Sequence, residues 1–529
     1  MKTRLSWIAV VAAVALGGVA ISSVVAHLPP SVDGCPDAGR PPTISPDYAG
    51  VTIPPNIAPL NFLIKEPGTA FMVRVAADGD GKPAIEVHGR SPAIRFPLDA
   101  WRRLLDRKPA AVSFDVFVKT QDGHWTRYER FSASVAPEAI DPYLFYRKIK
   151  PMYNSWGPIT WHQRHVETFR EDCLLDNARM DDHAGCMNCH AFYQNRPDTM
   201  VVQIRGSRGG MLVLRDGKLE KVETRTPRNK APASVGSWHP SGRLAAFSVN
   251  KVVQAFHMAG VEVRDAMDMT SDLILYRTDD RSVFSTPRIA EPAWLEAFPQ
   301  WSPDGKHLYF CRAPKPWTDD DTVPPEGYQN VRYSLVRIAY DIDSGQWGDI
   351  ETVLDADAMG LSITEPRFSP DGRWCVMCLC SYSYQGSFKA DADLYLLDTA
   401  TGQCRRMECS SDQSDTWHSW SSNGRWLAFS SRRRDGQFLK TYFSYIASDG
   451  TARKPFLLPQ EDPADHDDNI LLYHLPELVT GPMPVEAREI LRVIQDSELV
   501  TGDAITGASR RAVGGAPEGA YQLPDGGKH

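Results

Sequence analysis

The sequence predicts a mainly β protein, with a small N-terminal β-sandwich-like domain and a C-terminal β-propeller of about six blades. Two observations carry this prediction. Residues 61–137 alternate apolar and polar side chains in the short runs that are typical of strands. Residues 198–480 repeat a unit of four short strands roughly every 50 to 65 residues, which is the pattern of propeller blades. Rings of five or seven blades remain alternatives.

The chain begins with an export segment. After "MKTRLSW", which supplies Lys2 and Arg4, the run "IAVVAAVALGGVAISSVVA" contains no charge. Its length lies between that of a signal-peptide core and that of a short membrane span, and Val24 and Ala26 offer a small-residue cleavage site. Residues 1–26 are therefore either a cleaved signal peptide or a retained membrane anchor. We expect the protein body in the periplasm or cell envelope, secreted or anchored by this segment.

The segments on either side of the repeats differ in composition. Residues 27–60 are rich in Pro and Gly, which interrupt helices and strand ladders, and they predict an extended linker. Residues 61–137 hold the strand-like runs "FMVRVAA", "AIEVHG" and "AVSFDVFVKT", interrupted by one helical piece, "PLDAWRRLLDRK". Residues 481–529 predict a C-terminal helix and a disordered, glycine-rich tail.

The repeated unit is visible in four places: "SWHPSGRLAAFS", "QWSPDGKHLYFC", "RFSPDGRWCVMC" and "SWSSNGRWLAFS". Each has an aromatic residue, a turn that contains glycine, and an alternating apolar strand. Glycine tolerates the positive φ of tight hairpin turns. The turn glycines are Gly242, Gly305, Gly372 and Gly424. Two less regular stretches, which begin at Met200 and near residue 456, are expected to complete the ring.

Residues 138–197 contain the motif "CMNCH" in a stretch dense in aromatic, Met and His residues. We expect a mostly helical or irregular haem-bearing insert that joins the two β parts. Two cysteines separated by two residues and followed by histidine are the attachment signal of a c-type haem, in which the thiols form thioethers and the imidazole binds the iron. Cys186 and Cys189 are the predicted anchors of one covalent haem c, and His190 is the predicted proximal metal ligand.

Other uses of the two cysteines are weaker. A redox dithiol normally begins a helix after a strand, and no such pattern surrounds the motif. A structural zinc site needs four ligands, and the nearest second pair is Cys375 and Cys378. Residues three apart on a strand face opposite ways, so these two suit buried packing better than one metal. Zinc binding and a chance match stay open as alternatives.

The second axial ligand of the iron has several candidates. Met200 follows the motif by ten residues and would raise the reduction potential, whereas a second histidine would lower it. Met200 is our predicted metal ligand, and its ordinary interpretation is core packing. The histidine candidates are His162, His165, His183 and His257. An open position is the remaining alternative.

Three arginines near the motif could pair with the haem carboxylates. Arg196, Arg205 and Arg208 lie within twenty residues of it, and a guanidinium binds a carboxylate through two parallel hydrogen bonds. A solvated charge at a blade edge is the alternative for each of them.

The "WSPDG" units resemble the PD40 repeats of TolB-like propellers. Together with "CMNCH", "RGSRGG" and "HSWSSNGRWLAFSSRRRDG", they resemble a group of bacterial envelope proteins often labelled TolB-like or cytochrome c biosynthesis proteins. The resemblance covers roughly residues 138–480 and implies a propeller, a single haem and the cell envelope. It implies no activity. The chain departs from TolB itself, whose N-terminal domain is α/β and which binds no haem.

Composition narrows the possible functions. The net charge is −8 and the pI is about 6.0, which argues against nucleic-acid binding. No G-x-S-x-G stretch or hydrolase-sized domain follows the propeller, so a peptidase is excluded. Three classes remain: an electron-transfer or redox-sensing cytochrome whose propeller docks an unidentified envelope or redox partner, a non-enzymatic adaptor with structural haem, and a haem enzyme with an open distal site.

Two further patterns have simple interpretations. Outside the cytoplasm, Cys404 and Cys409 could form a disulfide. The acidic stretch "QEDPADHDDN" lacks the fixed ligand spacing of a calcium loop and predicts a solvated loop.

Overall fold

The computed structural model describes residues 30–80, 82–151, 158–180, 185–225, 231–257, 262, 264–496 and 499–500. The predicted export segment, His183 and nearly all of the predicted tail lie outside these residues. Within the described ranges, no helix combines the length and the apolar character needed to cross a bilayer.

The N-terminal part consists of two sheets and one helix. The larger sheet has six strands, in the order β2-β9-β7-β4-β5 with β8 beside β7, and the smaller one has the order β1-β3-β6. The strands are β1 (Ile44–Ser45), β2 (Thr52–Ile53), β3 (Phe62–Ile64), β4 (Ala70–Ala77), β5 (Ile85–Gly89), β6 (Ala93–Ile94), β7 (Ala111–Lys119), β8 (Trp125–Arg127) and β9 (Phe131–Val135). The helix predicted between strands is α2 (Leu98–Leu105), which buries Trp101, Leu104 and Leu105.

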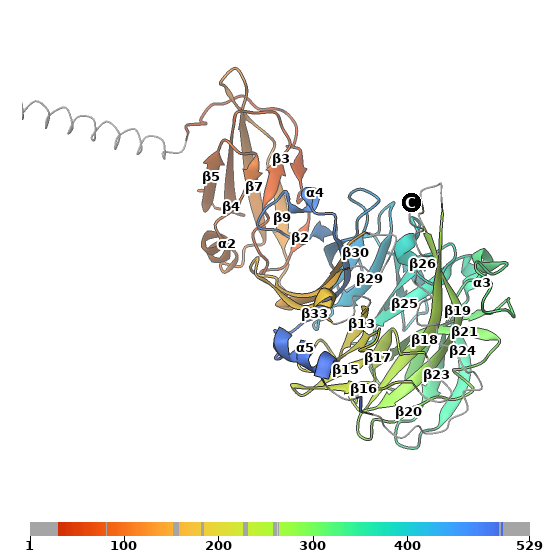
Figure 1. Ribbon diagram of the computed structural model, residues 1–529. Helices are drawn as coiled ribbons and strands as arrows, with labels where there is room; N and C mark the ends of the chain where they lie inside the picture. The colour runs from red at the N-terminus through yellow and green to blue at the C-terminus, as the bar shows by residue number, and fades with distance from the viewer. Residues whose placement is uncertain are drawn as a thin grey trace, which may run out of the picture.

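An aromatic core joins this part to the last blade of the propeller. Phe62, Phe114 and Phe131 pack together, with Phe114 stacked on Phe131 at 4.7 Å between ring centroids. The same continuous core includes Trp426 and Tyr473 from the C-terminal half of the chain. Figure 1 shows the N-terminal sheets beside β30 and β33. Shared burial of large aromatic rings holds the two parts together.

The rest of the described chain contains six four-stranded antiparallel sheets. Five are built from consecutive strands. These are β13 (Met187–Phe192), β14 (Met200–Ile204), β15 (Gly210–Arg215) and β16 (Lys218–Val222); β17 (Gly236–Trp238), β18 (Leu244–Phe256), β19 (Arg264–Arg277) and β20 (Val283–Phe284); β21 (Trp294–Trp301), β22 (His307–Pro314), β23 (Ser334–Tyr340) and β24 (Trp347–Leu354); β25 (Ser362–Phe368), β26 (Trp374–Cys380), β27 (Asp393–Asp398) and β28 (Cys404–Arg406); and β29 (Asp415–Trp420), β30 (Trp426–Ser431), β31 (Lys440–Tyr445) and β32 (Phe456–Leu457).

The sixth sheet combines the two ends of the propeller. It has the order β12-β11-β10-β33, from β10 (Tyr143–Ile149), β11 (Ile159–His165), β12 (Glu171–Asp176) and β33 (Leu472–Val479). The inner strands β33, β13, β17, β21, β25 and β29 touch one another in sequence and return to β33, so the six sheets form a closed ring (Figure 1). Closure leaves no inner sheet edge exposed.

The expectation of a mostly helical or irregular insert at 138–197 is wrong. This segment supplies β10, β11 and β12 of one blade and β13 of the next, and the short η1 (Asn177–Arg179) is the only helical piece among its described residues. The propeller therefore begins at Tyr143 and not at residue 198. The aromatic residues that obscured the pattern also favour strands, and the partner strand β33 is far away in the sequence.

Short helices complete the chain: η2 (Tyr328–Asn330), α3 (Ala356–Met359), η3 (Gly386–Phe388), α4 (Asp465–Asp468) and α5 (Ala487–Asp496). Helix α5 lies where a C-terminal helix was expected, and it buries Ile490, Val493 and Ile494 against β12 and β16. The acidic stretch around α4 belongs to no group of three or more His, Cys, Asp or Glu residues suited to a metal among the described residues.

The repeat turns have the predicted backbone. Gly242, Gly305, Gly372 and Gly424 have φ values of 69°, 73°, 74° and 66°. Several of these turns also pack on the turn of the preceding blade: a Cβ on Gly305 would lie 2.7 Å from the His239 ring, and one on Gly372 would lie 3.5 Å from Pro303. The glycines thus serve the hairpins and the contact between blades.

Candidate functional site

The "CMNCH" motif lies at the centre of the propeller. Its last four residues belong to β13, the inner strand of its blade, and Cys186 comes directly before it. The pairing with β14 shifts between Met187 and His190, which marks a β-bulge within the motif. Cys186 and Cys189 are 4% and 8% exposed, so both thiols are buried.

The same bulge occurs in four other inner strands. The pairing shifts at the corresponding place in β21, β25, β29 and β33. One residue in each bulge has a left-handed backbone: Phe298, Glu365, Trp417 and Leu475, with φ between 48° and 57°. Phe298, Trp417 and Leu475 share one apolar cluster with Cys189, which fills the middle of the ring. The bulges therefore build a packed centre.

Cys189 also lines a hollow of about 950 Å³, a volume that includes the open solvent at its mouth. Five basic side chains line it, and no Asp or Glu is among the lining residues. The basic residues are Arg147, Lys150, Arg205, Arg264 and Arg432. In a chain of net charge −8, such a concentration of positive charge is a local feature that attracts anionic groups.

Aromatic side chains and one histidine complete the wall of this hollow. Tyr384, Phe388 and Trp417 line it, and the Arg264 guanidinium lies 4.2 Å from the Phe388 ring centroid. His474, on β33, lines it as well, and its Nδ1 is 2.7 Å from Nη2 of Arg147. Burial, reinforced by Arg147 and other cations, holds the pKa of His474 well below its usual value. This imidazole is therefore neutral and adds no positive charge to the hollow.

His190 does not line the hollow. Its ring packs among Phe145, Trp161 and Phe192, with centroids 4.9 to 6.2 Å apart. Its Nε2 lies 3.4 Å from a carboxylate oxygen of Glu477, and its Nδ1 has no hydrogen-bond partner among the described residues. Burial, together with the charges of Arg147 and Arg367, lowers the pKa of His190 to about 3. Neighbouring residues on a strand face opposite ways, which separates His190 from Cys189.

The other predicted ligands lie away from the hollow too. Met200 is on β14, opposite Phe192, in the apolar cluster between two blades. His257 contacts Asp265 at 2.9 Å, and His162 contacts Glu171 at the same distance. His165 packs edge-on against the ring of Tyr143. Neither Met200 nor any of these three histidines lines the hollow.

Only one of the three predicted arginines reaches the hollow. Arg205 lines it, and its backbone N–H donates to the carbonyl of Cys186 at 2.8 Å. Arg196 instead donates to Asp198 at 2.8 and 3.0 Å. Arg208 donates to the carbonyl of Gln495 on the outside of the molecule.

Of the basic residues that line the hollow, only Arg205 was predicted from the sequence, and His474 was not predicted either. They come from β10, β19, β33 and the loop after β30, which are remote in the sequence. Arg147 and His474 are 327 residues apart. The available signal was a basic or histidine residue in an otherwise apolar strand, and it becomes informative only when the blade order is known.

The fit of a haem to these residues is partial. Cys189, the basic side chains and the aromatic walls suit a flat apolar macrocycle with two carboxylates. Cys186 does not line the hollow: it lies in the apolar cluster that also contains Met200, and burial raises the pKa of its thiol to about 12. The axial role predicted for His190 gets no support from its position.

Three other cysteines pack inside the propeller. Cys375, Cys378 and Cys380 are fully buried on β26, and Cys375 belongs to a different apolar cluster from the other two. The interpretation as packing residues is consistent with this placement. Cys404 and Cys409 are both free thiols, so the expected disulfide between them is absent.

No family model and no curated protein matches the chain. Solved structures of similar shape include TolB from Acinetobacter baumannii, with 14% identity over 69% of this chain and 78% of that one, and a TM-score of 0.38. A nidogen/laminin complex matches with 9% identity over 64% and 99% of the two chains and a TM-score of 0.36. An oligogalacturonate lyase in complex with manganese matches with 10% identity over 60% and 74%, and a TM-score of 0.34. At these scores, the six sheets themselves carry the fold assignment.

Proposed function

We propose that this chain is an exported protein in which a TolB-like propeller carries one haem c, bound through Cys186 and Cys189, and that it transfers electrons or senses redox state. The observation that supports this proposal is the hollow at Cys189, with five basic side chains and no acidic one among its lining residues. A haem bound there would supply one-electron chemistry.

The residues of the chain have distinct tasks in this proposal. Arg147, Arg205, Arg264 and Arg432 hold the two haem carboxylates by charge and hydrogen bonds. The packed centre of the ring, with Trp417 and Leu475, excludes water from one side of the hollow. The rest of the propeller surface is left for an unidentified envelope or redox partner.

A second candidate is a haem protein that binds an external ligand. Neither Met200 nor His162, His165 or His257 lines the hollow, and the histidine that does line it, His474, is already hydrogen-bonded to Arg147, which favours an open position on the iron. Such a position would suit a sensor or an enzyme rather than a simple electron carrier.

Covalent haem is the first test. The full chain, exported from a host with a c-type maturation system, should show a haem-stained band after denaturing electrophoresis. Cys186→Ala with Cys189→Ala should abolish the band. Cys173→Ala is the matched control, because Cys173 is an exposed free thiol outside the hollow, and it should keep the band. A native protein without stain would contradict the proposal.

The ferrous spectrum of the same preparation separates the two candidates. A low-spin spectrum that carbon monoxide leaves unchanged supports the electron carrier. Rapid and complete carbon monoxide binding supports the open site and contradicts the proposed electron-transfer function.

A further inference from the structure

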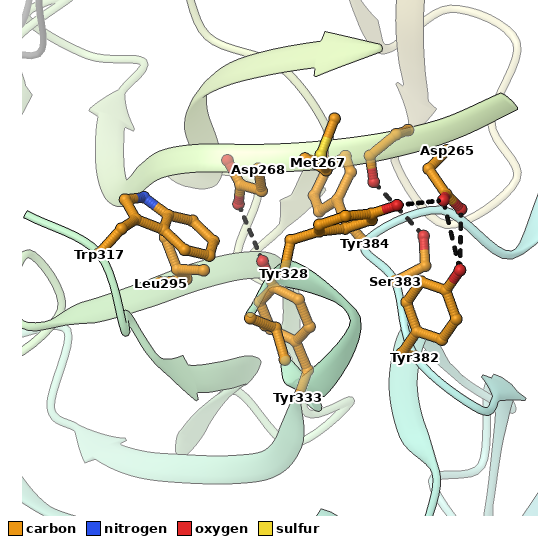
Figure 2. A pocket seen from close by; sticks show the side chains of 12 residues that line it. Asp265, Met267, Asp268, Leu295, Trp317, Tyr328, Tyr333, Tyr382, Ser383 and Tyr384 are labelled. Carbon is orange, nitrogen blue, oxygen red and sulfur yellow. Dashed lines mark hydrogen bonds between the residues drawn. The ribbon is translucent and has the colours of Figure 1, made fainter. Parts of the chain in front are cut away.

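A second, smaller pocket lies next to the hollow at Cys189. It measures about 290 Å³ including its mouth, and Tyr384 lines both cavities. One wall comes from β19, and the others come from Leu295 on β21 and from the loops that follow β22 and β26 (Figure 2). The proposed haem function does not use this pocket.

Aromatic side chains dominate the pocket wall. Four tyrosines and one tryptophan line it: Trp317, Tyr328, Tyr333, Tyr382 and Tyr384. Two carboxylates from the same strand, Asp265 and Asp268, enter it as well (Figure 2). Aromatic faces and carboxylates both attract cations, so this combination is typical of sites for organic ammonium ions.

The chain itself provides a cation for Asp265. Nζ of Lys389 lies 2.5 Å from Asp265 and 2.8 Å from Glu262, and it sits 3.6 Å from the centroid of the Tyr382 ring. Asp265 also accepts from the hydroxyl of Tyr328 at 3.0 Å. This end of the pocket already shows how the aromatic and acidic groups hold an ammonium group.

Asp268 has no such partner. It is 2% exposed, and its Oδ2 accepts from Asn250 at 3.0 Å and from the hydroxyl of Tyr333 at 3.2 Å. Its Oδ1 has no hydrogen-bond partner among the described residues. Burial raises the pKa of this carboxyl to about 7, against the opposing effect of the nearby Ser271, Asn250 and Tyr333 groups, so it is mainly ionised above that pH. The nearest charge that affects it is another carboxylate, Asp272.

A buried carboxylate oxygen without a donor is costly, and each such group in a native protein calls for an explanation, of which a bound cation or water is one. We propose that this pocket binds a small organic ammonium ion, with Oδ1 of Asp268 accepting its N–H and the aromatic rings surrounding its carbon atoms. Because the pocket is small, methylammonium is the ligand of this class chosen as the probe. A hard metal ion fits less well, because the walls are aromatic and no group of three metal-ligating residues exists among the described residues.

Methylammonium is a direct probe of this site. Saturation-transfer NMR on the full chain should show transfer from the protein to the methyl group. Asp268→Asn should weaken binding about tenfold, because it removes a charged acceptor. The matched control Asp279→Asn, which changes an Asp beyond the far end of β19, should leave binding unchanged. Equal transfer in native protein and Asp268→Asn would overturn the proposal.

Two additions keep the test decisive. If Asp268→Asn fails to fold, Trp317→Leu replaces it and should also reduce transfer, because it removes one aromatic wall. Potassium chloride at matched ionic strength should not compete. Full competition by potassium would show a general cation site and reject the role of the aromatic rings.

Discussion

Strands β13 and β25 contain the same bulge at the same place in two blades, but the two bulges do different work. In β25, the Glu365 carboxylate accepts from the backbone N–H of Trp417 at 2.7 Å and from the hydroxyl of Thr416 at 3.0 Å. In β13, Cys189 instead lines a hollow with five basic side chains. One bulge links neighbouring blades and the other opens a cavity. The backbone of the ring thus stays constant while the residues in the bulge decide between structure and binding.

The largest expected effect concerns the turns that repeat from blade to blade. Gly305→Ala should lower the free energy of unfolding by about 2 to 4 kcal/mol, from positive-φ strain plus a clash with the ring of His239, 2.7 Å away. Gly372→Ala should cost about 1 to 2 kcal/mol, because its Cβ would meet Pro303 at an ordinary 3.5 Å. Urea unfolding measures both.

Gly345→Ala is the matched control for backbone strain alone. Its φ is 71° and nothing lies within 4 Å of an added Cβ. It should behave like Gly372→Ala. Equal losses in all three variants would show that the contact between the turns of neighbouring blades contributes nothing.

These turns are also the part of the fold that the sequence predicts best. Four blades carry a turn motif with glycine, and its spacing predicts their strands and their number. The first two blades lack the motif, so the region around "CMNCH" was expected to be irregular. One of these blades is completed only by β33, and pairing across more than three hundred residues leaves no local signal.

The site was predictable in part for the same reason. The motif is local in the sequence and singles out Cys189, which lines the hollow, together with Cys186, which does not. The basic hollow depends on which strands meet at the centre of the ring, so only Arg205, close to the motif, could be named beforehand. Strand alternation within β13 also places His190 and Cys189 apart, which the bare motif cannot show.

The next prediction concerns the titration of Glu365, in the bulge of β25. Burial raises the pKa of Glu365 from 4.5 to about 7, against the opposing hydrogen bonds from Trp417 and Thr416. Between about pH 4.5 and pH 7 the folded state keeps a proton that the unfolded chain has lost. This group therefore stabilises the fold fully below pH 4.5, and that stability is lost as the pH rises toward 7.

Glu365→Gln removes this titration. Between pH 4.5 and pH 7.5 the native protein should lose about 1 to 3 kcal/mol of unfolding free energy relative to the variant. The control Glu351→Gln makes the same substitution at an exposed position on β24. The midpoints of urea unfolding at the two pH values measure this change. A constant difference for Glu365→Gln would mean that this carboxylate is ionised in the fold throughout the range.

The smallest expected effect concerns the bulge in β13. The experiment uses the haem-bound protein. Arg205 lines the hollow, whereas Arg196 is paired with Asp198 outside it. Removal of a positive charge beside a haem favours the oxidised iron, so Arg205→Gln should lower the reduction potential, by an amount on the order of tens of millivolts for a nearby, partly screened charge. Arg196→Gln removes the same charge at a distance, and its own carboxylate partner already compensates it, so the potential should stay within error. Spectroelectrochemical titration measures both. If Arg205→Gln and Arg196→Gln give the same potential while the haem stays attached, the basic hollow is not where the haem lies, and the cationic residues must serve a different anion.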